Sequence, residues 1–184
     1  VIDHMLSNGT AGLLDLDINQ QMKMLDARSG IFLLQDHSAV ILTGNPREGQ
    51  TLDEVRQLLL AEIEKLKKGD FSDDLLPSVI NNMKLQYYNS LESNEERVSM
   101  FVDAFINGTP WEQAVKRQDR IAGMTKQQIM DFVSRHFTDG YVAVYKRQGV
   151  DPNQKKIDKP EITPIPTNRD TVSQFVKDIQ NAKV

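Results

Sequence analysis

Cysteine is absent from the 184 residues of this chain. Its absence excludes disulfide bonds, thiolate metal ligands and a cysteine nucleophile, and it is compatible with any redox compartment. Long apolar runs are lacking too, because no stretch approaches the roughly 20 residues that a membrane-spanning helix needs. We therefore expect no membrane partner. Since the first residue is Val1, we expect the segment to be a piece of a longer polypeptide.

A strong excess of one charge is lacking as well. The 22 lysines and arginines are set against 26 aspartates and glutamates, which gives a net charge of −4. Proteins that bind nucleic acid usually carry a basic patch, so we expect no nucleic-acid partner. With 39% hydrophobic and 26% charged residues, the composition is that of an ordinary folded domain. The length suits one core with a tail.

The motifs of the common catalytic sites are missing. Only three histidines occur, His4, His37 and His136, and none belongs to the inverted zinc-peptidase motif HxxEH. We expect all three to be structural or surface residues. The sequence therefore predicts neither a metal site nor catalytic residues in this segment.

The spacing of Asp15, Asp17 and Asn19 is similar to the start of a calcium-binding loop. Such a loop requires glycine at its sixth position, where this chain has Gln20. We therefore interpret 12–21 as a short helix that carries two exposed carboxylates.

The chain does contain a series of helix-start signals. In a capping box, Ser or Thr is followed three residues later by Glu or Gln, and each side chain bonds the other residue's backbone N–H. Four such pairs occur, beginning at Thr51, Ser93, Thr109 and Thr125. A further amphipathic helix is predicted after Asp74. Gly69 and Gly123 suit the left-handed conformation that ends many helices.

Strand signals lie on both sides of these helices. Residues 22–34 and 38–43 predict two strands before them, and 141–145 predicts one after them. The uninterrupted apolar run at 39–42 predicts a strand that is covered on both faces. We expect an α+β fold, with a small antiparallel or mixed sheet of three strands packed on one side by helices.

The character of the chain changes near its end. Prolines and polar residues are frequent in KPEITPIPTNRD, which does not suit a regular element. We expect a domain at 1–150, an interdomain linker at 151–170 and the start of a following segment at 171–184. That last segment predicts a short amphipathic helix.

Several features, taken in order, resemble the pitrilysin/insulinase (M16) zinc metallopeptidase family. They are MLSNGTAGLL at 5–14, the strand pair, the long capped helix at Thr51, and WEQAVKRQDRIAGMTKQQIMDFVSRHF at 111–137. The resemblance implies a peptidase-like domain of the LuxS/MPP-like metallohydrolase fold, truncated at its N-terminus. The linker is similar to the connection between the two halves of long bacterial members. This places the chain as the second domain of an N-terminal half.

The resemblance also implies a role. In this family a catalytic domain binds zinc, while neighbouring domains form the walls of a substrate chamber. We therefore expect no cofactor in this segment and zinc in the catalytic domain of the parent protein. The expected partners are a peptide or unfolded protein substrate and the neighbouring domains of the same chain. A parent in the bacterial periplasm or cell envelope is compatible with this resemblance.

The family alignment also points to candidate substrate-binding residues. In insulin-degrading members the matching strand anchors one end of the peptide, and it falls here on Met24, Leu25, Asp26 and Ala27. Those members have glycines nearby, whereas this chain has Ala27 followed by Arg28. An ordinary core strand is the other interpretation of these residues.

Two functional hypotheses remain open at this point. The first is a non-catalytic domain of a zinc protease, and the second is a scaffold or assembly subunit that derives from a degenerate M16 peptidase. An HxxEH motif upstream of this segment would distinguish the first from the second. A stand-alone module that binds a small ligand is disfavoured, since no convergent polar cluster is visible in the sequence.

Overall fold

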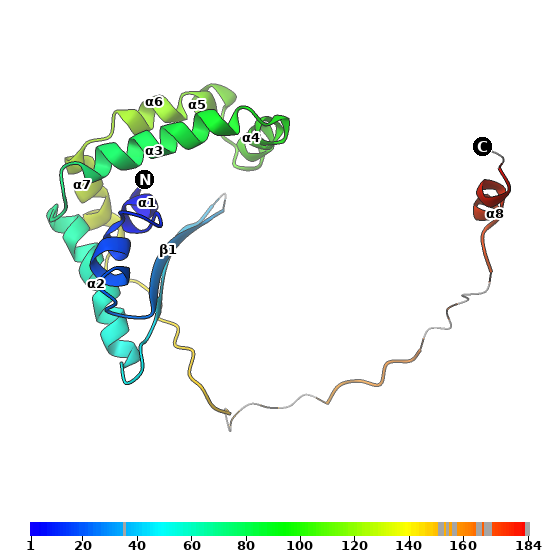
Figure 1. The fold of residues 1–184 in the computed structure, drawn as a ribbon, viewed down its shortest axis with the longest axis horizontal. Coiled ribbons are helices and arrows are strands. Elements are labelled where there is room, and N and C mark those ends of the chain that lie inside the picture. The colour runs from blue at the N-terminus through cyan, green and yellow to red at the C-terminus, as the bar shows by residue number, and fades with distance from the viewer. Residues whose placement is uncertain are drawn as a thin grey trace. The chain divides into compact units, whose positions relative to one another are not determined.

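The computed structural model describes residues 1–34, 36–150, 153, 155, 158–164, 167 and 171–182. The chain divides into two compact units, Val1–Tyr145 and Lys146–Val184. Figure 1 shows the elements of each unit. The predicted linker at 151–170 lies partly outside the described residues.

The first unit contains an antiparallel pair of strands. β1 (Asp26–Leu33) pairs with β2 (Ser38–Asn45) from Asp26 opposite Asn45 to Leu33 opposite Ser38. Among the described residues the sheet has only these two strands. The expected α+β class is confirmed, but the expected sheet of three strands is wrong.

The third strand, predicted over 141–145, does not form in the described chain. This segment pairs with no strand there, and the side chains of Val142 and Val144 are 88% and 89% exposed. Its Tyr145 hydroxyl instead donates to Asp53 Oδ1 at 3.3 Å. High β-propensity mainly reflects packing on a half-buried sheet, so composition alone does not produce a strand without a neighbouring edge.

The prediction that 39–42 is covered on both faces is also wrong. Val40 and Ile41, whose side chains point to opposite faces, are 39% and 52% exposed. A short apolar run indicates burial only when elements are present to cover both faces, which the sequence does not reveal. Here the described helices leave much of the strand uncovered.

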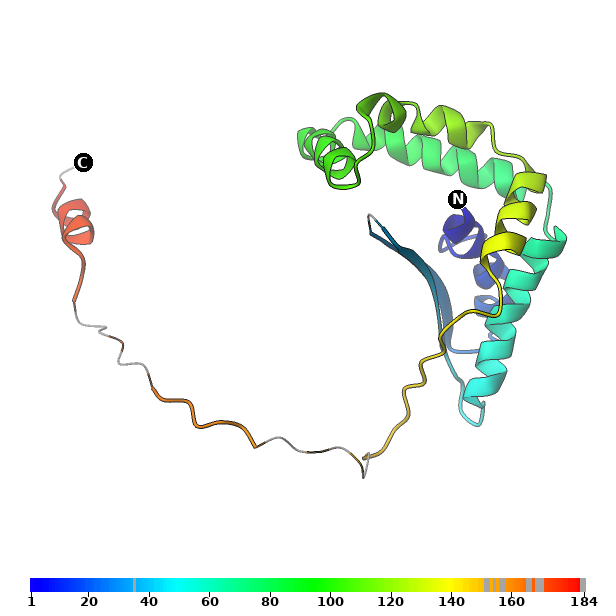
Figure 2. The same ribbon diagram turned by 180° about the vertical axis from the view of Figure 1, so that it is seen from behind.

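The remaining elements are helical, and their order follows the sequence prediction closely. They are α1 (Ile2–Leu6), the π-helix η1 (Asp15–Asn19), α2 (Leu52–Lys68), α3 (Leu75–Ser90), α4 (Asn94–Ile106), α5 (Trp111–Val115), α6 (Arg117–Ala122), α7 (Lys126–His136) and, in the second unit, α8 (Gln174–Asn181). Within the first unit, α3 and α6 run side by side in both views (Figures 1 and 2).

The helix ends test the capping predictions one by one. Complete capping boxes form at Thr51 and at Thr125, and the Ser93 hydroxyl accepts the N–H of Glu96. The capping box predicted at Thr109 is wrong, because Pro110 precedes the first residue of α5. The N–H of Thr109 bonds the carbonyl of Ala104 at 2.8 Å, which ties this residue to the end of α4.

The two predicted glycine exits differ. Gly69 ends α2 with φ of 69°, a left-handed conformation, so this prediction is confirmed. Gly123 follows α6 with φ of −87°, so a left-handed exit there is wrong. The turn at Gly123 needs no special backbone conformation, and the sequence does not distinguish the two cases.

The core of the first unit lies where α1, η1, the start of β1, α2 and α7 meet. The fully buried large side chains in this region are Met5, Leu6, Leu14, Ile18, Met24, Leu66 and Val133. Gly44 allows α2 to approach the sheet, since a Cβ at this position would lie 2.6 Å from Val55 Cγ1 and 2.9 Å from Met24 Sδ. Because Ala27 is opposite Gly44, the face of the sheet that carries both residues is the inner face.

Candidate functional site

The four residues predicted to bind substrate lead into β1 and begin it. Met24 and Ala27 are buried, with 2% and 1% of their surfaces exposed. Leu25 is 72% exposed, and Asp26 is the first residue of the strand. The structure therefore places two of the four side chains in the core and does not gather all four on one surface.

The backbone at these positions already has partners. The N–H of Leu25 donates to the carbonyl of Asn45 at 2.9 Å. The N–H of Ala27 donates to Asn19 Oδ1, and Asn19 Nδ2 donates to the carbonyl of Ala27, each at 2.8 Å. A peptide that approaches Ala27 would meet a backbone whose donor and acceptor are both engaged.

The alternation of an antiparallel ladder shows which other backbone groups face outward. Residues in such a ladder direct their N–H and C=O groups alternately toward and away from the partner strand. Because Ala27 faces away from β2, so do Ser29, Ile31 and Leu33. The outward backbone groups of these three residues form the open edge of β1.

The face of the sheet next to this edge is partly covered by α1. The Ser29 hydroxyl donates to Asp3, at 2.7 Å from Oδ1 and 3.1 Å from the carbonyl oxygen. Since side chains leave a strand perpendicular to its edge, this contact places α1 against the inner face of the sheet. Farther along, Ile31 and Leu33 are 45% and 65% exposed.

A hollow of about 400 Å³ lies beside the first residues of β1. The residues that line it are Ser7, Gly9, Asp15, Asn19, Gln20, Asp26, Ala27 and Arg28. Asp26 and Arg28 form an ion pair at 2.7 Å on its rim. The lining of this hollow ends at Arg28, and the open edge of β1 begins at the next residue, Ser29.

Asp15 contributes to this hollow as a structural residue. Only 7% of its surface is exposed, so its expected role as an exposed carboxylate is wrong. Its Oδ2 accepts the backbone N–H groups of Asn8 at 2.8 Å and Gly12 at 3.1 Å. Sequence spacing does not reveal this burial, because it depends on how the loop at 7–12 folds back.

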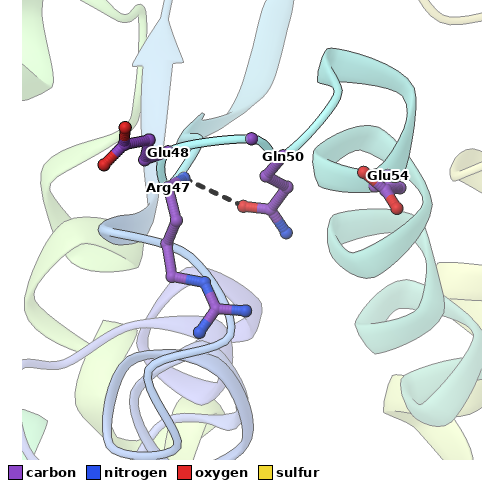
Figure 3. A pocket seen from close by; sticks show the side chains of 5 residues that line it. Arg47, Glu48, Gln50 and Glu54 are labelled. Carbon is purple, nitrogen blue, oxygen red and sulfur yellow. Dashed lines mark hydrogen bonds between the residues drawn. The ribbon is translucent and has the colours of Figure 1, made fainter.

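A second hollow, of about 410 Å³, lies between β2 and α2 (Figure 3). The N–H of Arg47 donates to Gln50 Oε1 at 3.1 Å, and Gln50 Nε2 donates to the carbonyl of Lys23 at 2.9 Å. Hydrogen bonds from the backbone and side chain of Thr51 lower the pKa of Glu54. In Figure 3 the Arg47 guanidinium points away from Gln50 and Glu54. These groups hold a turn and a helix cap, and they do not converge on a ligand.

One cluster of ionisable groups joins η1 to α2. Lys65 Nζ lies 2.6 Å from Asp17 Oδ2 and 3.0 Å from Glu62 Oε1. The Glu62 side chain is only 5% exposed, and within the described residues its Oε2 has no hydrogen-bond partner. Burial raises the pKa of Glu62, although the hydrogen bond from Lys65 acts to lower it. Burial alone would lower the pKa of Lys65, but the hydrogen bonds to Asp17 and Glu62 outweigh it and raise that pKa.

The histidines lie far apart in the sequence and on different elements. His4 is in α1, His37 precedes β2, and His136 ends α7, where its ring lies 4.4 Å from that of Phe132. Among the described residues, no three His, Asp or Glu side chains are grouped so that they could hold a metal ion. Nor does the described part of the chain include a helix that is long and apolar enough to cross a membrane.

Comparison of the chain with protein-family models gives no match, and comparison with curated proteins gives none either. Among solved structures, the chain is similar to a protease from Helicobacter pylori, with a TM-score of 0.66 and 21% sequence identity. The match covers 75% of this chain and 33% of the protease chain, so our segment corresponds to about a third of that protein. The chain therefore shares its fold with part of a protease.

Proposed function

We propose that this chain is a non-catalytic, peptidase-like domain of a larger zinc metallopeptidase of the M16 family. In this proposal it forms part of the wall of a substrate chamber, contacts neighbouring domains of the same protein and holds an extended peptide. Zinc and the residues that cleave the peptide belong to another domain of the parent.

The observation that carries the proposal is the partial fold match to a protease. Most of this chain aligns with a third of that chain, which is what a single domain of a multidomain peptidase would give. The sequence adds that HxxEH is absent and that the three histidines are widely spaced. Because fold alone does not establish function, the proposal rests also on the features of the site.

The site supports the binding of a peptide. Among the described residues β1 pairs with β2 alone, so the outward backbone groups of Ser29, Ile31 and Leu33 form an open edge to which an extended peptide can add a strand. The exposed Ile31 and Leu33 side chains offer apolar contacts beside it.

The proposal is tested by measuring bound zinc and peptidase activity for this segment and for the full parent protein. We expect bound zinc and cleavage of unfolded polypeptides with the parent only. Zinc-dependent cleavage by the purified segment contradicts the proposal. If the parent also lacks zinc and activity, the chain is better described as a scaffold or assembly subunit.

A further inference from the structure

We infer that the Asn19 side chain sets the register of an extended peptide on β1, because it occupies the strand edge at Ala27 and leaves the edge open only from Ser29 onward. This inference rests on the proposed function, since it concerns the peptide that the domain is proposed to hold. It assigns a specificity role to Asn19, which lies outside the four residues predicted from the sequence.

The side-chain amide of Asn19 bonds β1 in the way that the backbone of a neighbouring strand residue would. A residue of an added strand would give one N–H and one C=O to the outward-facing backbone of β1. Asn19 supplies the same pair, with Nδ2 donating to the carbonyl of Ala27 and Oδ1 accepting its N–H, both at 2.8 Å. Both outward groups of Ala27 are thereby satisfied, and a peptide gains nothing there unless it displaces the amide.

The segment that carries Asn19 is fixed on several sides. In η1 the N–H of Gln20 bonds the carbonyl of Asp15 at 2.9 Å, five residues back, as is typical of a π-helix. Ile18 is fully buried in the core. Asp17 binds Lys65 of α2 at 2.6 Å. Because these contacts anchor the residues just before it, Asn19 holds a constant position against the strand.

The open part of the edge indicates what kind of peptide fits. Ile31 and Val40, opposite each other on the inner face, are 45% and 39% exposed. On the outer face Phe32 and Ile41 are 55% and 52% exposed. An added strand would extend both faces, so apolar side chains pointing to either face would contact these residues. The expected ligand is an extended peptide that is rich in β-branched and aromatic residues and starts opposite Ser29.

The test compares the wild-type chain with Asn19→Ala and with Gln20→Ala as a matched control. Gln20 belongs to the same turn, but its side chain bonds the carbonyl of Thr10 at 3.1 Å and does not contact the strand. The probe is a synthetic peptide of non-repeating Val, Thr, Ile and Tyr residues with a nitroxide label at one end. Paramagnetic broadening of backbone amide signals along β1 then reports the register of the bound peptide.

With the wild-type chain and with Gln20→Ala, we expect the labelled peptide to bind β1 in one register. The pattern of broadened amide signals should then show that no peptide residue lies opposite Ala27. In Asn19→Ala the newly freed Ala27 groups become available, so the bound peptide shifts by about two residues, the repeat of outward-facing backbone groups. An unchanged register in Asn19→Ala overturns the inference while leaving the proposed function intact. A chain that binds no peptide in any variant contradicts both.

Hydrogen exchange supplies a check that does not depend on the folding of a variant. In the wild-type chain the Ala27 amide is expected to exchange slowly compared with the amides of Ile31 and Leu33, because only Ala27 has its outward N–H bonded to Asn19. Exchange at Ala27 as fast as at Ile31 would mean that the amide contact does not persist, and the inference would be wrong. In Asn19→Ala, protection at Ala27 is expected to disappear, while amides within α2 stay protected.

Discussion

Two regions of the first unit carry similar apolar patterns but differ greatly in how far their side chains are buried. The packed region, formed by α1, η1, the start of β1, α2 and α7, buries Leu66 and Val133 completely. The uncovered region, formed by the far end of the β1–β2 hairpin with α4 and α5, leaves Phe105 88% exposed and Phe32 55% exposed. The difference shows that an apolar stripe indicates a surface that prefers to be covered, and not which element covers it.

The uncovered region contains its own local contacts. Phe101 of α4 stacks on Trp111 of α5, with ring centroids 4.1 Å apart and an angle of 19° between the rings, yet both remain exposed. Exposed apolar patches of this kind are typical of surfaces that meet another protein segment. The proposed place of this chain within a larger peptidase gives such a surface an expected use, namely contact with neighbouring domains.

The largest expected effect separates the two regions directly. Leu66→Ala removes a fully buried side chain and should lower the free energy of unfolding by about 2–5 kcal/mol, because it leaves a cavity. Phe105→Ala removes a larger side chain that is exposed, so the change should stay within about 0.5 kcal/mol. Urea denaturation of both variants measures this. Equal losses would show that the uncovered region packs in solution.

A smaller effect is expected from two glycines of the same hairpin. Gly44→Ala places a Cβ 2.6 Å from Val55 Cγ1 and should cost about 1–3 kcal/mol through overpacking. For Gly30→Ala, no heavy atom of the described residues lies within 4 Å of the added Cβ, so stability should be unchanged or slightly raised. Thermal unfolding of the two variants compares the packed and open parts of the sheet. A cost at Gly30 as large as at Gly44 would contradict the contrast.

Two threonines with the same sequence signal should also differ. Thr51→Ala removes a complete capping box from α2 and should cost about 1 kcal/mol. Thr109→Ala should have almost no effect, because Thr109 contacts α4 through its backbone and does not cap α5. The measurement is again denaturant unfolding. A comparable loss at Thr109 would mean that its hydroxyl caps the helix after all.

The smallest expected effect concerns pH. Since burial raises the pKa of Glu62 in the folded chain, its stabilising contribution is fully present below its ordinary pKa of 4.5 and is lost as pH rises through the raised pKa. The unfolding free energy of the wild type should therefore fall more than that of Glu62→Gln as pH increases from about 4 to about 8.

Glu64 on the same helix provides a control, because its pKa is shifted in the opposite direction. The hydrogen bond from Lys67 lowers the pKa of this exposed carboxylate, so its small contribution is present above its ordinary pKa and is lost as pH falls through the lowered pKa. Glu64→Gln should thus change the pH dependence in the reverse direction. Identical pH profiles for the two variants would show that Glu62 is not buried as described.

The parts of the fold that sequence predicts well are those decided by near neighbours. The capping boxes at Thr51 and Thr125 involve residues three positions apart, and both form as expected. The same motif fails at Thr109, because a backbone bond to Ala104 draws this residue into the end of the preceding helix. Local patterns therefore predict helix starts until a neighbouring element competes for the same groups.

The candidate site depends on contacts that local patterns do not contain. Asn19 and Ala27 are eight residues apart, and their paired hydrogen bonds determine where the edge of β1 is free. The sequence correctly places a strand near Ala27, but it gives no information about which backbone groups face outward. The open edge at 29–33 follows only from the register of β1 with β2 and from the position of η1.

The central claim, that this domain holds a peptide without cleaving it, is tested most directly by one experiment on the chain. An extended, fluorescently labelled peptide is titrated with the chain in the presence of zinc, its anisotropy is followed, and its mass is determined afterwards. Our account predicts that anisotropy rises to saturation and that the peptide is recovered intact. A cleaved peptide, or an anisotropy that does not change, would contradict it.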